Sequence, residues 1–160
     1  MTGQLLFGLT FLSALGAGLI AGLFFAFSSF VMTALSRIPS VQGIAAMQSI
    51  NVAVLNPLFA LVFFGTALAC IALAIQSFFR WGETGTIYVL AGSLFYLVGF
   101  LVTIAFNVPL NDSLASVDPN SAAGADLWKH YIVNWTAWNH VRTVASLAAL
   151  ASFIIALRYR

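Results

Sequence analysis

Residues Leu5–Leu35 read LLFGLTFLSALGAGLIAGLFFAFSSFVMTAL and contain no charged side chain. At about 1.5 Å rise per residue this run would form roughly 46 Å of helix, whereas the hydrocarbon core of a bilayer is about 30 Å thick. The run therefore predicts a membrane-spanning helix that tilts, kinks or projects from the bilayer. It lacks a preceding basic region and is longer than the apolar part of a signal peptide, so we expect an uncleaved first span.

The rest of the chain has the same membrane-protein composition. Of 160 residues, 62% are hydrophobic and only 6% are charged, which is too apolar for a soluble protein. The length allows one compact bundle and no soluble domain beside it. The formal net charge of +2 comes from few residues, and no basic patch is large enough to bind nucleic acid. The single cysteine, Cys70, is expected to be a small buried hydrophobe.

Three further apolar runs predict three more spans. The pair Asn56-Pro57 is typical of a helix start, with asparagine as N-cap and proline in the first turn. Residues Asn107–Leu127 form the longest polar segment, expected to be a loop that could cap a site. We predict an all-α fold, an integral membrane four-helix bundle. Its single transmembrane domain covers residues 1–160, with spans at about 5–35, 57–79, 87–106 and 135–157.

Two smaller patterns concern packing and the first connection. Gln48, Asn51 and Leu55 share one helical face, which predicts a short interfacial helix between spans 1 and 2. A continuous helix kinked at Pro57 is the alternative. Small side chains recur at every fourth position of the first span, at Ala14, Gly18, Gly22 and Ala26. This stripe predicts a helix-packing seam and leaves a homo-oligomer as an open alternative.

Charge distribution predicts an orientation. Four spans put both termini on one side of the membrane. Under the positive-inside rule, Arg80, Arg158 and Arg160 lie at the cytoplasmic face, against Arg37 and Lys129 on the other side. We therefore expect a protein of the cell inner membrane with cytoplasmic termini and its polar site on the non-cytoplasmic side.

Polar residues concentrate at one end of the predicted bundle, above all in WKHYIVNWTAWNHVR, residues Trp128–Arg142. Ionisable residues inside a membrane are costly and are functional-site candidates by default. Trp135, Trp138, Asn139 and Arg142 fall on a single face of the fourth helix. The alternative interpretation is that Arg142 extends to the interface and the tryptophans form an ordinary aromatic belt.

The loops after the first and third spans share a membrane face, so their polar residues can meet the start of the fourth helix. The available partners are amides and one carboxylate: Gln48, Asn51, Asn107, Asn111 and Asp112. Among the histidines, His140 is the only one at this depth, and it is the predicted proton-transfer group near neutral pH. Together these residues predict a binding or catalytic site.

Metal binding is weakly indicated. Two histidines and one cysteine do not give the spacing of a zinc or copper site, so no metal ligands are assigned. Haem held by His130 or His140, or copper, stays open at this point. No glycine-rich phosphate loop and no serine nucleophile motif occurs.

Several motifs spread over essentially the whole chain resemble those of a known family: FFAFSSFVMTAL, MQSIN, NPLF, TIAFNVPLND, and W-x-x-Y followed by WTAWNHVRT. They are similar to the anthrone oxygenase-like family of small four-span membrane proteins. That family includes fungal enzymes that oxidise anthrones to anthraquinones and many bacterial members without an assigned function. The resemblance implies insertion of one oxygen atom from O2 into an activated ring carbon of a lipophilic aromatic, without a cofactor.

Such a reaction needs a base, donors for an oxyanion and an apolar pocket for the rings. From residue type and inferred proximity, we assign His140 as base and Arg142, Asn139 and Asn107 as oxyanion donors. On the same grounds, Trp135, Trp138 and Phe27 are assigned as ring contacts. On this assignment, replacing His140 by alanine should abolish turnover and leave the bundle folded. The competing functions are a non-catalytic binding or transport module for a lipophilic molecule, and a haem or metal redox protein.

Overall fold

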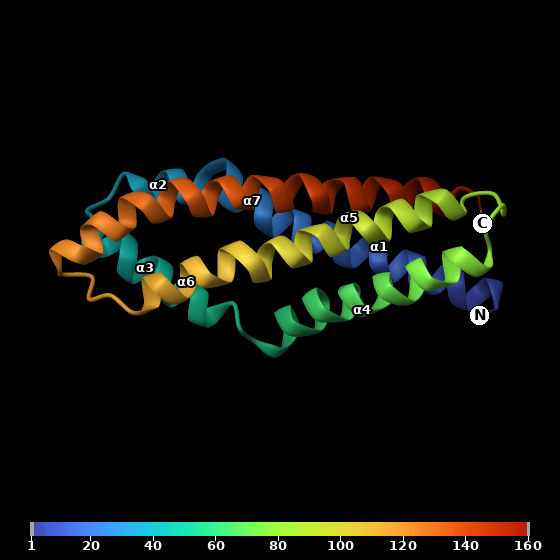
Figure 1. Cartoon of the computed structure of the whole chain (residues 1–160), viewed down its shortest axis with the longest axis horizontal. Helices are drawn as coiled ribbons and strands as arrows, with labels where there is room; N and C mark the ends of the chain where they lie inside the picture. Colours follow the sequence, from blue (N-terminus) through green and yellow to red (C-terminus); the bar gives the residue numbers. More distant parts are fainter. Residues whose placement is uncertain (1, 160) are drawn as a thin grey trace.

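The computed structural model describes residues 2–159, which form helices joined by short turns and contain no strand. Four helical segments run along one long bundle, and both termini lie at the same end (Figure 1). Each is long and apolar enough to span a membrane: Gly3–Ser36, Pro57–Phe79, Thr86–Ala115 and Ala122–Leu157. The all-α prediction of an integral membrane four-helix bundle is confirmed.

Two of the four segments contain a π-helical turn. The first segment comprises α1 (Gly3–Ala26), the π-turn η1 (Phe27–Val31) and α2 (Met32–Ser36). The third comprises α5 (Thr86–Val102), the π-turn η2 (Thr103–Asn107) and α6 (Val108–Ala115). The remaining helices are α3 (Ser40–Ala53), α4 (Pro57–Phe79) and α7 (Ala122–Leu157).

Side-chain caps fix where two of these helices begin. The Asn56 side chain accepts a hydrogen bond of 3.0 Å from the backbone N–H of Phe59, and Pro57 follows it in the first turn of α4. This confirms the predicted helix start. Ser121 caps α7 in the same way, accepting from the N–H of Gly124 at 2.9 Å. Such caps satisfy backbone donors that have no partner within the helix.

The bundle has a different fourth helix in each half of its length. In the half that holds the termini, α7 and α4 each contact both α1 and α5. In the other half α3 contacts α2, α6 and α7, so it takes the place that α4 leaves (Figure 1). We call this second half the cap. Its core consists of Met32, Ile44, Met47, Leu114, Trp128, Tyr131 and Trp135.

The helices extend beyond the spans predicted from hydropathy. The expected loop Asn107–Leu127 is wrong: the chain is helical to Ala115 and again from Ala122. Proline has no backbone N–H and usually interrupts a helix. Pro109 follows the π-turn η2 closely, and the helix continues through it. A helix does lie between the first two spans, but Leu55 falls outside it because α3 ends at Ala53. Its place at the membrane interface stays a prediction, as do the single transmembrane domain and its span limits.

The length of α7 exceeds the thickness of the hydrocarbon core, and we expect the cap to be the part that projects from the bilayer. The 36 residues of α7 make roughly 54 Å of helix, against about 30 Å of hydrocarbon. In the other half, α1 and α4 approach closely at Gly16, where an added Cβ would lie 2.0 Å from Thr66 Oγ1. Gly16 is not part of the predicted small-residue stripe. Within that stripe, an added Cβ at Gly18 would lie 3.6 Å from Leu150 of α7, and Gly22 is exposed with nothing within 4 Å of an added Cβ.

Candidate functional site

The centre of the candidate site is a buried arginine held between two aromatic rings. Arg142 is only 5% exposed. Its Cζ atom lies 4.1 Å from the ring centroid of Phe24 and 4.8 Å from that of Trp135. Both contacts have cation–π geometry, which stabilises a guanidinium that has been removed from water. This corrects the alternative in which Arg142 extends to the interface.

Arg142 is held by neutral groups. Its Nε donates to Asn139 Oδ1 at 3.0 Å, and its Nη1 donates to Thr103 Oγ1 at 3.4 Å. The two ion pairs within residues 2–159 are Arg80–Glu83 and Lys129–Asp126, so neither involves Arg142. A guanidinium has five N–H donors, and these two hydrogen bonds leave three for other acceptors. Burial of such a charge costs free energy unless an anion or a strong hydrogen-bond acceptor interacts with it.

Asn139 fixes the arginine and has no donor left for a substrate. Its Nδ2 donates to the backbone carbonyl of Phe24 at 2.8 Å and to Ser28 Oγ at 2.7 Å, while its Oδ1 accepts from Arg142. Ser28 in turn shares a hydrogen bond of 2.9 Å with Thr143. Asn139 therefore orients Arg142, which differs from the oxyanion-donor role assigned to it from the sequence.

Both π-turns lie at the level of this cluster. The turn η1 begins just after Phe24 and contains Ser28, while η2 begins at Thr103 and ends at Asn107. Each of them contacts α7. π-Turns inside α-helices are frequent at functional sites, because they redirect side chains and backbone groups that a regular helix would hide. Here they place site residues from α1 and from α5 against the same part of α7.

A second group of amides continues the cluster into the cap. Asn107 is completely buried; its Nδ2 donates to the backbone carbonyl of Trp135 at 3.1 Å, and its Oδ1 has no partner. Asn111 Oδ1 accepts from Tyr131 Oη and from Trp135 Nε1, both at 2.8 Å. The Nδ2 of Asn51 is also buried without a partner. Unsatisfied buried polar atoms are rare and call for an explanation.

Aromatic residues surround these polar groups. The Phe27 and Trp135 ring centroids are 5.4 Å apart, and their contact with a substrate ring stays a prediction. Trp135 also stacks on Tyr131, which stacks on Trp128, with centroid separations of 6.1 and 5.6 Å. Trp138 lies apart from them and stacks on Phe106 at 3.7 Å. Its role as a substrate contact stays a prediction.

Three predicted site residues lie outside the buried cluster. His140 is on the exposed side of α7, because residues two apart on a helix point to nearly opposite faces. This corrects the expectation that His140 and Arg142 face one substrate. Asp112 is exposed on α6. Gln48 donates from Nε2 to the carbonyls of Leu114 and Val117 at 2.8 and 3.1 Å, so it ties α3 to the end of α6.

Sequence reasoning missed several residues of the cluster, namely Phe24, Ser28, Thr103, Tyr131 and Thr143. Two signals were available for some of them. Phe24 and Ser28 fall in the FFAFSS motif of the first run, and Thr103 precedes Asn107 by four residues. Tyr131 and Thr143 end the motifs W-x-x-Y and WTAWNHVRT, but the motifs alone gave neither residue a role.

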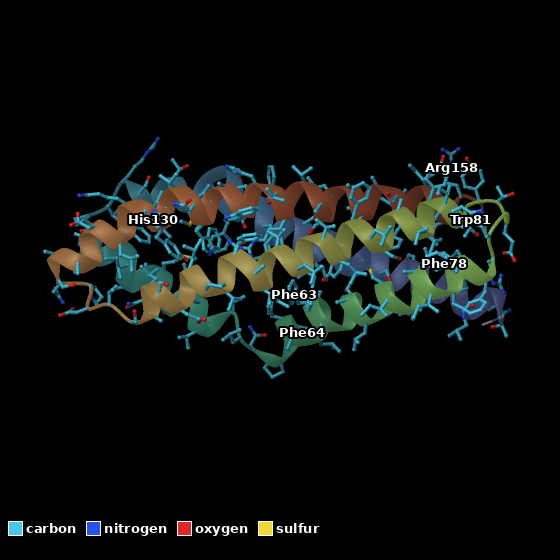
Figure 2. All side chains as sticks on the ribbon, viewed as in Figure 1. Phe63, Phe64, Phe78, Trp81, His130 and Arg158 are labelled. Carbon is cyan, nitrogen blue, oxygen red and sulfur yellow. The ribbon has the colours of Figure 1, made fainter. Side chains whose placement is uncertain are left out.

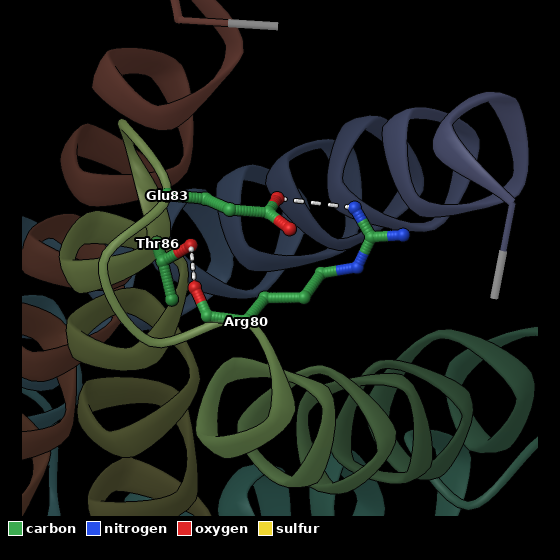
Figure 3. Close-up of polar contacts among 3 residues, drawn as sticks. All are labelled: Arg80, Glu83 and Thr86. Atoms are coloured by element: carbon green, nitrogen blue, oxygen red, sulfur yellow. Dashed lines mark hydrogen bonds and ion pairs between the residues drawn. The ribbon is translucent and has the colours of Figure 1, made fainter.

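The opposite end of the bundle holds a different feature, with no contact to Arg142. A depression of about 480 Å³ is lined by Gly3, Gln4, Phe7, Arg80, Glu83, Thr84 and Tyr159. In the turn beside it, Arg80 pairs with Glu83 at 3.1 Å and its backbone carbonyl accepts from Thr86 Oγ1 (Figure 3). Figure 2 shows Trp81 and Arg158 near this end and His130 near the other.

Metal ligands do not gather in the described part of the chain. Among residues 2–159 there is no group of three His, Cys, Asp or Glu side chains that could hold a metal ion. His130 is exposed, and its ring nitrogens lie 3.2 and 3.3 Å from Asn134 Nδ2.

Four apolar helices around a buried arginine define a small integral membrane protein with a candidate binding or catalytic site inside its bundle. The model of the family described as Anthrone oxygenase matches residues 59–152, more than half of the chain, and the chain belongs to this family. The matched residues include Arg142 and every partner named above except Phe24. No curated protein and no solved structure gave a match.

Proposed function

We propose that this protein is a membrane-embedded oxygenase that acts with O2 on a planar, lipophilic, anthrone-type aromatic and needs no cofactor. Membership of the anthrone oxygenase family supports the reaction class. The observation that carries the proposal is the Arg142 guanidinium, which is buried between two rings and has three N–H donors free of protein partners. Such donors suit an oxygen atom on which negative charge develops.

The guanidinium presents its edge to the ligand. The Cζ atom of the guanidinium lies against the rings of Phe24 and Trp135, so the unpaired N–H groups at its edge are the part that a ligand can meet. A carbonyl or enolate oxygen can meet this edge while the rest of a flat aromatic contacts the neighbouring rings. Because the surroundings exclude water, the interaction with a negative oxygen is stronger than it would be in solution.

The chemistry balances without an added reductant. An anthrone carbon between two aryl rings loses a proton to give an enolate, whose oxygen is stabilised by Arg142. The electron-rich carbon then bonds to one oxygen atom of O2, and protonation of the distal oxygen gives a hydroperoxide. Loss of water breaks the O–O bond and the remaining C–H bond and leaves a ketone. The CH2 group is oxidised by four electrons, and O2 is reduced to the new carbonyl oxygen and one water.

The first test is oxygen uptake by the detergent-purified protein with an anthrone. We expect one O2 consumed per anthraquinone formed, at a rate proportional to protein concentration. Absorption and elemental analysis of the same sample separate the alternatives. A haem band, or stoichiometric copper or iron needed for turnover, would overturn the cofactor-free reaction. Tight binding of the anthrone without oxygen uptake would establish the non-catalytic binding module instead.

His140 provides a separate test of the proton-transfer step. Because its side chain is on the exposed side of α7, we expect His140→Ala to keep at least half of wild-type turnover. The proton would leave to water at the membrane boundary once Arg142 stabilises the enolate. The measurement is initial rate from pH 6 to 9. Loss of activity in a folded His140→Ala sample at every pH tested would restore His140 as the base.

The proposed orientation places the termini in the cytoplasm and the cap on the other side of the inner membrane. Cys70 is buried, so single exposed cysteines can report the topology. We expect Asn120→Cys, in the turn before α7, to react with a membrane-impermeant maleimide in intact spheroplasts. Thr84→Cys, at the opposite end, should react only after permeabilisation. The reverse pattern would invert the orientation.

A further inference from the structure

The amide of Asn107 has one orientation that its surroundings allow. Its Nδ2 donates to the carbonyl oxygen of Trp135 at 3.1 Å. The flipped amide would place two acceptor oxygens against each other, so the carbonyl of Trp135 decides which atom is nitrogen. The side chain is completely buried, and its Oδ1 is left with no hydrogen-bond partner. What Asn107 offers to a ligand is therefore an acceptor.

Asn107 and Arg142 belong to one cluster, because both have partners in Trp135 and in the turn η2. The ring of Trp135 covers Arg142, and the backbone carbonyl of the same residue binds Asn107. Thr103, which accepts from Arg142, lies four residues before Asn107 on the same helix. The turn η2 holds both residues and contacts α7, the helix that carries Arg142. The cluster therefore has unpaired donors at Arg142 and, at a separate point, an unpaired acceptor at Asn107.

We propose that Asn107 determines substrate specificity by accepting a hydrogen bond from a hydroxyl group of the ligand. The ligand oxygen that meets Arg142 must be an acceptor, while the group that meets Asn107 Oδ1 must be a donor. A hydroxyl meta to the ring carbon that carries the carbonyl gives such a separation on a flat aromatic. A ligand without this donor leaves a buried acceptor unpaired, which costs affinity. The inference rests on the proposed function, because it uses the same site.

The test compares two ligands that cannot be oxidised at the reacting carbon: 2-hydroxyanthraquinone and 2-methoxyanthraquinone. Their dissociation constants are measured by quenching of tryptophan fluorescence, in buffer acidic enough to keep the hydroxyl protonated. We expect the wild-type protein to bind the hydroxy compound roughly tenfold more tightly. Asn107→Leu should bind both compounds equally, since leucine has a similar volume and no acceptor.

Asn134→Leu is the matched control, because the Asn134 amide bonds to His130 on the exposed side of α7. It should keep the wild-type preference. Equal affinity of the wild-type protein for both ligands would overturn the role of Asn107 and leave the oxygenase proposal standing, as would a preference that survives in Asn107→Leu. Binding of neither ligand would overturn both. The wild-type comparison decides the matter even if Asn107→Leu does not fold.

Discussion

Replacing Arg142 by alanine is expected to lower the turnover of an anthrone by about 10²–10³-fold, the usual cost of removing an oxyanion donor from a preorganised site. Arg142 is buried between Phe24 and Trp135 and has no carboxylate partner within residues 2–159. Its remaining N–H groups are the donors that the proposal assigns to the enolate oxygen. The measurement is kcat from initial rates of oxygen uptake.

Two further variants separate chemistry from folding in this experiment. Arg142→Lys keeps the charge but cannot reproduce the planar contacts to Asn139 and Thr103, so we expect activity between those of the wild type and of Arg142→Ala. Arg158→Ala removes an exposed arginine at the end of α7 and should be fully active. Wild-type kcat in a monodisperse Arg142→Ala sample would rule out the proposed role of the guanidinium.

Gly16→Leu is expected to prevent assembly of the bundle or to reduce its thermal stability sharply. A Cβ at this position would lie 2.0 Å from Oγ1 and 3.1 Å from Cβ of Thr66, a buried residue of α4. The helices α1 and α4 would have to separate, and overpacking of this kind costs about 1–3 kcal/mol even for smaller insertions. The measurement is the monodisperse fraction after size-exclusion chromatography, followed by thermal unfolding in detergent.

Gly22→Leu is the matched control on the same helix. An added Cβ there meets nothing within 4 Å, so the variant should behave like the wild type. Equal stability of the two variants would mean that α1 and α4 do not approach at Gly16. If Gly22→Leu alone were unstable, the predicted small-residue stripe would be the surface that makes a helix contact. A second copy of the chain would then be the first candidate for the partner in that contact.

The helices could be predicted from the sequence because their causes are local. Inside a bilayer, a long uncharged run can form all of its backbone hydrogen bonds within itself only as a helix. The Asn56-Pro57 pair indicates a helix start without any information from the rest of the chain. The predicted limits of the third and fourth helices were wrong in the segment Asn107–Leu127, most of which is helical. Polar residues there indicated a loop, but a projecting cap tolerates polar helices because water surrounds it.

The candidate site was predicted only in outline. Arg142 bonds to Asn139, and Asn107 and Asn111 both bond to Trp135, whose ring lies against Arg142, because the topology brings the ends of alternate spans to one side. The role of each amide could not be predicted, since it depends on whether its nitrogen or its oxygen is already engaged. Asn139 uses all of its hydrogen-bonding atoms within the protein, whereas Asn107 keeps its oxygen free. Side-chain direction likewise separates His140 from Arg142, although they are two residues apart.

The burial of Arg142 against Phe24 and Trp135 also affects how α7 is inserted into the membrane. An arginine in the middle of a helix opposes insertion of that helix by about 2.5–3.5 kcal/mol, and α7 leaves the ribosome after α1, α4 and α5. Its partners from outside α7, Phe24 and Thr103, belong to helices synthesised earlier. We therefore expect α7 to enter the bilayer against a preassembled group of three helices, so that truncation or loss of α1 leaves α7 outside the membrane and open to degradation.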